Sequence, residues 1–212
     1  KARSPSYQER YLWLPMSATA GLADGWTYIG DIDLEPETSI EVTAGIDWWG
    51  EGFRLTPEIY FRDISDLIQG TPSTNTTANM FAMMSSGRPP LQYGNVDAEI
   101  YGFDLALSYT LGTRVRFDAA AGYARGKRRD VADNLYRIAP LNGSLAVTYT
   151  ESAFLVRTEL VAYAAQEDVS RYNDELPTSG YGIVNLHGSW QLGPATRLEL
   201  AAENLFDRGY QD

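Results

Sequence analysis

From residue 39 onward, apolar and polar residues alternate along the chain in short runs. In the first run, Ile40, Val42 and Ala44 alternate with Glu41 and Thr43. A period of two residues places one face of a strand in an apolar medium and the other in a polar one. The runs predict eight strands and no convincing helix. They lie at 40–48, 53–62, 101–110, 115–123, 145–149, 154–162, 184–192 and 198–202.

The segments between these runs alternate in length. Short links lie near 50–52, 112–113, 151–152 and 193–196, and long ones near 70–90, 126–139 and 168–179. Transmembrane β-barrels join their strands by short turns at one end and long loops at the other, whereas a soluble β-sandwich has no reason for that order. We therefore predict an all-β, antiparallel transmembrane β-barrel, with a soluble sandwich as the alternative. Pro57 counts against a strand at 53–62, since proline cannot donate to the ladder.

Composition narrows the possible functions. The 28 acidic residues outnumber the 17 basic ones, for a net charge of −11, so we expect no nucleic-acid partner. The chain has no Cys, which excludes thiolate metal sites and a Cys nucleophile. The 14 Tyr and 5 Trp fit the aromatic girdles of a membrane barrel. Mid-strand charges such as Glu58, Asp104, Arg157 and Glu159 fall on the polar parity and would face a wet lumen.

Several motifs go beyond periodicity. Residues 3–11 read RSPSYQERY and residues 28–39 read YIGDIDLEPETS. They resemble the R-x-P-x-x-x-E-x-Y and G-N-x-x-L-x-P-E-x-S stretches of TonB-dependent receptors, with Asp31 in place of Asn. Residues 93–104, YGNVDAEIYGFD, resemble the family's N-x-x-x-A-x-x-x-G-x-E strand, with Asp104 in place of Glu. Residues 203–210, ENLFDRGY, are similar to its N-L-F-D-x-x-Y signature.

This resemblance implies a fold and a setting. The family has a 22-stranded barrel closed by an N-terminal plug. Residues 1–212 would be a C-terminal part of that barrel, with an extracellular loop region at 1–38 and about eight strands within 39–206. The plug and a last strand would lie outside the chain. The resemblance further implies a bacterial outer-membrane receptor, not an enzyme, energised by the TonB complex through an upstream segment and in contact with lipid and lipopolysaccharide.

A finer likeness concerns the transported ligand. Segments 10–15, 21–25, 68–72, 88–92 and 126–130 resemble the copper-receptor branch of the same family. That likeness implies uptake of copper ions, with copper as cargo and no bound cofactor. A receptor for a siderophore or another scarce ligand is the alternative. A small self-contained structural barrel and an outer-membrane enzyme are the other readings.

The candidate metal ligands are three methionines in the longest predicted loop, 71–90. Met80, Met83 and Met84 form a Met-x-x-Met-Met cluster, and thioethers are soft ligands that suit Cu(I). The cluster would capture copper on an extracellular loop. The competing interpretation is that these flexible side chains only fill gaps in loop packing.

Two further features of the sequence bear on possible chemistry. His187 is the only histidine. It falls on the polar parity of its strand, and we expect a hydrogen-bonded residue of the lumen wall rather than a catalytic group, because no partner motif accompanies it. Residues 127–129, Lys-Arg-Arg, form a basic loop tip that would bind lipopolysaccharide phosphates or simply be solvated.

Overall fold

The computed structural model describes residues 1–13 and 25–210, which form one antiparallel sheet of 11 strands with two helices. Its strands follow the order β1-β3-β5-β6-β7-β8-β9-β10-β11, with β4 beside β5 and the two-residue β2 parallel to β6. The helices are α1 (Tyr7–Tyr11) and α2 (Thr76–Ser86). The strands are β1 (Ala2–Arg3), β2 (Tyr28–Ile29), β3 (Glu37–Gly45), β4 (Trp48–Gly50), β5 (Phe53–Pro72), β6 (Leu91–Leu111), β7 (Val115–Arg128), β8 (Asn142–Glu151), β9 (Phe154–Tyr163), β10 (Tyr181–Gly193) and β11 (Thr196–Ala202).

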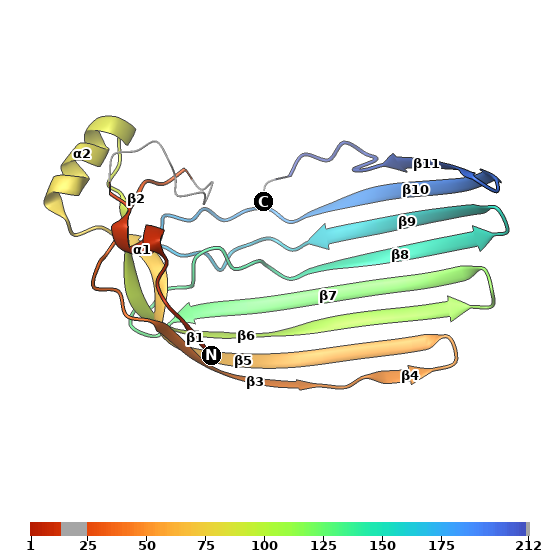
Figure 1. Ribbon diagram of the computed structural model, residues 1–212, viewed down its shortest axis with the longest axis horizontal. Helices are drawn as coiled ribbons and strands as arrows, with labels where there is room; N and C mark the ends of the chain where they lie inside the picture. Colours follow the sequence, from red (N-terminus) through yellow and green to blue (C-terminus); the bar gives the residue numbers. More distant parts are fainter. Residues whose placement is uncertain (14–24, 211–212) are drawn as a thin grey trace.

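Short and long connections lie at opposite ends of the sheet. The tight turns after β4, β6, β8 and β10 gather at one end, while the links that follow β5, β7 and β9 gather at the other, together with α1, α2 and β2 (Figure 1). We call the second end the loop end. The alternation predicted from the sequence is thus confirmed, and neighbouring long strands form successive hairpins.

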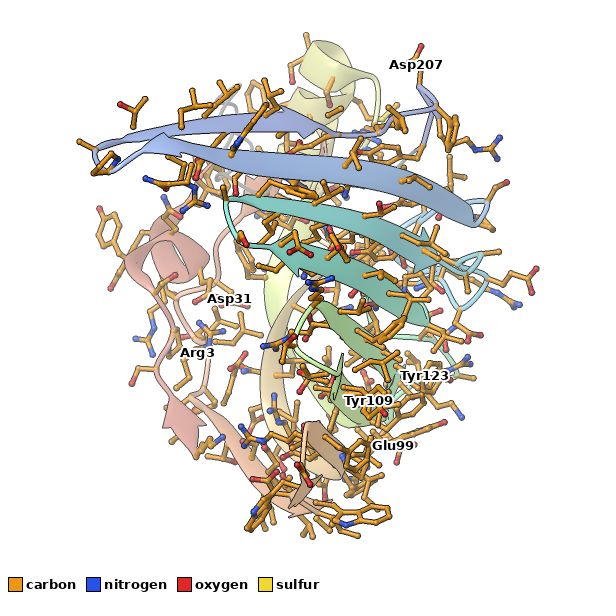
Figure 2. The ribbon with its side chains drawn as sticks, turned by 90° about the vertical axis from the view of Figure 1, so that its right-hand side faces the viewer. Arg3, Asp31, Glu99, Tyr109, Tyr123 and Asp207 are labelled. Carbon is orange, nitrogen blue, oxygen red and sulfur yellow. The ribbon has the colours of Figure 1, made fainter. Side chains whose placement is uncertain are left out.

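The two faces of the sheet differ in polarity along its whole width. One register row joins Phe53, Tyr109, Phe117 and Val147 across four strands. Within residues 1–13 and 25–210, no second layer covers this row or its neighbours: Ile40 is 75 % exposed and Leu200 68 % exposed. Figure 2 places Tyr109 and Tyr123 on the side of the sheet away from Arg3 and Asp31. A bare apolar face of this extent requires an apolar surrounding, which the soluble sandwich does not provide.

The opposite face carries charges that pair both within and across strands. Arg157 of β9 lies 2.9 Å from Glu159 and 3.5 Å from Asp118 of β7. Arg116 pairs with the same aspartate at 2.8 Å. These residues share the polar parity predicted for a wet lumen wall, where both signs of charge can be solvated or paired.

The β5–β6 hairpin is longer than the alternation predicted. Its strands have 20 and 21 residues, about twice the length that crosses a bilayer, so the hairpin extends well into the loop end (Figure 1). A bulge separates Ile64 from Leu67, and Asp66 within it has a φ of 59°. The bulge shifts the parity of the strand, which explains why the simple alternation ends near residue 62.

One sequence expectation about local structure needs correction. The expectation of no helix is wrong, because α2 occupies most of the long link between β5 and β6. Pro57 does lie within a strand, at the gap where β3 ends and β4 begins. The backbone N and C=O of one residue in an antiparallel strand point toward the same neighbour, and the carbonyl of Pro57 accepts the amide of Ile46 at 3.0 Å. The missing N–H donor of Pro57 therefore falls on the side where the neighbouring strand is interrupted, and it is tolerated there. Within the described ranges, no helix is long and apolar enough to cross a membrane.

Candidate ligand-facing surface at the loop end

The segment before β3 packs onto the tall β5–β6 hairpin and helps to build the loop end. Trp26, Tyr28 and Leu34 form an apolar cluster with Ile68 and Tyr93 of the hairpin. The rings of Tyr28 and Tyr93 stack at 5.1 Å. Burial of aromatic and aliphatic side chains makes the main favourable contribution to the free energy of this contact, so the cluster holds the segment against the hairpin.

The motif residues of this region are explained by structure rather than by ligand chemistry. Arg3 binds both carboxylate oxygens of Glu37 at 2.7 Å and reaches Glu9 at 3.0 Å. Asn95 accepts the amide of Glu35 at 2.8 Å and donates to the carbonyl of Asp66 at 2.8 Å. The motifs therefore hold together β1, the segment before β3, the start of β3 and the bulge of β5.

Helix α2 packs against β2, in the segment before β3, and presents its other face outward. Asn75 caps its N-terminus by accepting the amide of Ala78 at 3.0 Å, and Gly87 ends it in the left-handed conformation with a φ of 77°. Both are standard helix boundaries. Ala78 and Ala82 are fully buried against Ile29 of β2, so small side chains let the helix lie close to its support.

Met80, Met83 and Met84 all lie on the free side of α2. Helical geometry turns each residue by roughly 100°, which puts Met84 about 40° and Met83 about 60° from Met80 while both alanines fall nearly opposite. Residues three and four apart are neighbours on a helix surface, with Cβ atoms about 5–6 Å apart. The three side chains are 57 %, 51 % and 80 % exposed. We call them the thioether face.

Exposure of this kind argues against the interpretation that these methionines fill gaps in packing, since gap-filling side chains are buried. The thioether face is also the one soft-donor group found in the part of the chain that the structure describes. Among residues 1–13 and 25–210, no cluster of three or more His, Asp or Glu side chains could hold a metal ion.

The single histidine lies away from the loop end. His187 is in the middle of β10, opposite Arg157 of β9 and Ala201 of β11. This position on the polar parity agrees with the lumen wall expected for it. Among the described residues, no hydrogen bond or ion pair joins His187 to a carboxylate or a nucleophile.

The basic tip at 127–129 is largely occupied by internal partners. The side chain of Arg128 is only 5 % exposed, pairs with Asp130 at 2.5 Å and lies 5.0 Å from the ring of Tyr172. Arg129 pairs with Asp63 of β5. Two of the three cations are therefore engaged by the protein itself, which weakens the expectation of a phosphate-binding tip.

A buried polar network ties the long links to each other. Asp133, between β7 and β8, accepts the backbone amides of Arg171 and Tyr172 at 2.9 and 3.1 Å and the hydroxyl of Ser170 at 2.8 Å. Burial opposes ionisation of Asp133, but these hydrogen bonds outweigh it and hold its pKa below the usual value. Asn173, fully buried, donates to the carbonyl of Gly70 at 2.7 Å, so the link after β9 is also fastened to β5.

The same links border a cleft of about 680 Å³. Tyr163 and Tyr181 line it and stack at 5.0 Å, while Arg88 lies 4.0 Å above the ring of Trp26. The volume falls in the usual range for small-molecule sites. No pattern in the sequence indicates this cleft, because its walls come from five separate stretches of the chain, at 26, 88, 136–140, 163–166 and 173–181. The helix could have been anticipated from Asn75 and Gly87, which are residues typical of helix caps.

Two of the segments that resemble the copper-receptor branch extend outside the described residues. They are residues 21–25, of which only Gly25 is described, and the end of residues 10–15. The remaining segments, at 68–72, 88–92 and 126–130, all lie at the loop end, on the hairpin, beside α2 and at the end of β7.

Comparison with known proteins gives a consistent family. The model of the family described as "TonB dependent receptor-like, beta-barrel" matches residues 2–205. The heme/hemopexin utilization protein C of Haemophilus influenzae strain 86-028NP is 28 % identical over 99 % of this chain and 31 % of its own length. The protein of the same name from strain ATCC 51907 is 27 % identical over 99 % of this chain and 32 % of its own. The chain thus spans about a third of the curated relatives it matches.

Solved structures agree on the fold. The copper transporter OprC superposes with a TM-score of 0.81 at 24 % identity, over 99 % of this chain and 30 % of its own. The siderophore receptor PirA of Pseudomonas aeruginosa gives 0.68 at 15 % identity, over 98 % and 35 %. A variant of the ferric enterobactin receptor of Pseudomonas aeruginosa gives 0.66 at 18 % identity, over 85 % and 27 %.

Proposed function

Because the chain belongs to the TonB-dependent receptors of the bacterial outer membrane, we propose that it serves in the uptake of copper and that the thioether face of α2 is a first point of capture. The observation that carries this proposal is the arrangement of Met80, Met83 and Met84, three exposed soft donors on one side of one helix. Thioethers select Cu(I) over the harder and more abundant divalent cations.

The orientation of the sheet supports the same role. We propose that the loop end, including residues 1–38, faces the outside of the cell, since barrels of this type carry their long loops there. Copper arriving from outside the cell would then reach helix α2 before it enters the lumen. Release into the lumen and passage inward would depend on the TonB complex, as the family name implies, and on the plug that the resemblance to the family implies. The protein acts as a receptor and transporter rather than as an enzyme.

The similarity to the copper transporter OprC is in keeping with this ligand but does not decide it. That similarity lies at 24 % identity, and other relatives are named for heme or for siderophores. The proposal therefore depends on the donor chemistry of α2, which is a property of this chain.

A direct experiment compares ligands and variants in cells. Bacteria that depend on this receptor are supplied with radioactive copper, with TonB present or deleted. We expect TonB-dependent uptake that falls at least about tenfold when Met80, Met83 and Met84 are all changed to Leu, since even outer-shell changes at metal sites have effects of that size. Ser85→Ala, on the same helix, is the matched control. Copper uptake that is unchanged both by deletion of TonB and by the triple substitution would refute the proposal.

A second candidate is an organic ligand such as an iron chelate or heme. The cleft of about 680 Å³ favours it, because its volume falls in the usual range for small-molecule sites and Tyr163 and Tyr181 are among its walls. Supplying heme and ferric enterobactin to the same cells separates the candidates: Tyr181→Ala would lower uptake of the organic ligand and leave copper uptake unchanged.

A further inference from the structure

The thioether face has a chemical property that copper capture does not use. Methionine sulfur is oxidised by two-electron oxidants when solvent can reach it. Met84 is 80 % exposed, and Met80 and Met83 are each more than half exposed. The sulfurs that bind soft metal most readily are thus also the ones that an oxidant outside the cell reaches most readily.

We propose that Met80, Met83 and Met84 form an oxidation-sensitive modification site that switches capture of copper off. This inference rests on the function proposed above. The oxidant class is hypohalous acid. One equivalent of hypochlorous acid converts a thioether into a sulfoxide: sulfur loses two electrons, chlorine gains two and leaves as chloride, a proton is released, and the new S–O bond carries the oxygen.

The modified group is a poor ligand for Cu(I). A sulfoxide is polar and presents a hard oxygen in place of the soft sulfur lone pairs. Since the three side chains share one face, a single oxidised residue already removes one donor from the cluster. Bound Cu(I) would conversely occupy the sulfur lone pairs and protect the face from oxidation.

The contacts that hold α2 in place do not depend on the methionine side chains. Helix α2 is held by Ala78 and Ala82 against Ile29, and its ends are fixed by Asn75 and Gly87. None of these contacts uses a methionine side chain. An added oxygen on an exposed sulfur points into solvent and disrupts no packing, whereas oxidation of a buried methionine would damage a core. Capture is therefore lost without unfolding, which is what a reversible switch requires.

The test uses the full receptor in its native outer membrane, treated with graded hypochlorous acid. Mass spectrometry follows oxidation of the peptide that carries α2, and competition with a chromogenic chelator gives the affinity for Cu(I). We expect α2 to be oxidised at low dose, more slowly with Cu(I) bound, and affinity to fall at least about tenfold. Methionine sulfoxide reductase should restore it. Replacing all three methionines by Gln should mimic the oxidised state without oxidant, while Ser85→Ala should respond like the unmodified protein.

The outcomes separate the two proposals. If the reduced receptor binds Cu(I) through the triad but the oxidised receptor binds it equally well, the switch is overturned and capture stands. If the reduced receptor and the Met→Leu triple variant bind Cu(I) equally, the capture surface is overturned, and the switch with it. Circular dichroism of each form shows whether a loss of affinity reflects loss of the barrel instead; such unfolding would also overturn the switch.

Discussion

The guanidinium of Arg3 faces the carboxylate of Glu37 with two hydrogen bonds of 2.7 Å each. This bidentate pair joins the first strand of the sheet to the start of β3, between residues 34 positions apart in the sequence. Glu9 adds a third contact to the same guanidinium at 3.0 Å. Two motifs that are separated in the sequence thus meet at one cation.

Arg3→Lys keeps the charge but loses the two-pronged geometry. We expect a loss of about 1 kcal/mol, as for a well-formed but partly exposed ion pair, and faster proteolysis within residues 4–36 while the strands stay folded. Limited proteolysis of membrane-embedded protein measures this. Lys1→Ala, which removes a more exposed pair with Glu41, is the control and should cleave at the normal rate. Equal rates for all three proteins would contradict the role of Arg3.

Asn95 holds the bulge of β5 to the segment before β3. Asn95→Ala would leave the amide and carbonyl of Glu35 and the carbonyl of Asp66 without this partner. We expect about 1–3 kcal/mol of local destabilisation. Hydrogen exchange should accelerate around residues 33–37 and 64–67. Protection that remains at the original level would show that the side chain is dispensable.

Gly102 allows β6 and β7 to approach Tyr60. A Cβ at this position would overlap the carbonyl oxygen of Tyr123 and lie 2.5 Å from the Tyr60 hydroxyl. Gly102→Ala should therefore impair assembly, seen as loss of the heat-modifiable folded band on a gel. Gly50→Ala is the matched control, because a Cβ there meets nothing within 4 Å. Normal folding of the Gly102 variant would mean that the strands separate at little cost.

The network around Asp133 predicts a pH dependence. Burial opposes its ionisation, but hydrogen bonds from Arg171, Tyr172 and Ser170 lower its pKa. A lowered pKa in the folded state means that the stabilisation is complete above the ordinary value of about 4 and disappears as pH falls through the lowered value. Hydrogen exchange at residues 170–173, corrected for its intrinsic pH dependence, should therefore speed up only in strong acid.

Asp133→Asn should abolish that transition and leave the same amides weakly protected at every pH. Asp174→Asn, in the same link, should keep the transition. A transition that persists without the Asp133 carboxylate would assign it to another group.

The sequence predicted the strands best where one face meets a single medium. Phe53, Leu55 and Ile59 follow strict alternation because each faces the apolar side of the sheet. Beyond the bulge at Asp66, the hairpin is packed against Trp26, Leu34 and other residues of a distant segment, and a period of two no longer describes it.

The thioether face was predicted in part. Its residues could be named from their spacing, but their exposure follows from α2, which lacks the usual apolar stripe because its buried side consists of Ala78 and Ala82. Alanines carry little hydrophobic signal, so the pattern concealed the helix. The aromatic cleft was not predictable, since its walls come together only through the long links.

The central claim is that soft metal binds at the thioether face of α2. Crystals of the full receptor exposed to Ag(I), a soft stand-in for Cu(I), test it most directly by anomalous diffraction. The account predicts an anomalous peak beside the sulfurs of Met80, Met83 and Met84 that disappears in the Met→Leu triple variant and remains with Ser85→Ala. Silver bound elsewhere in the receptor, with no peak at α2 in the unmodified protein, would contradict it.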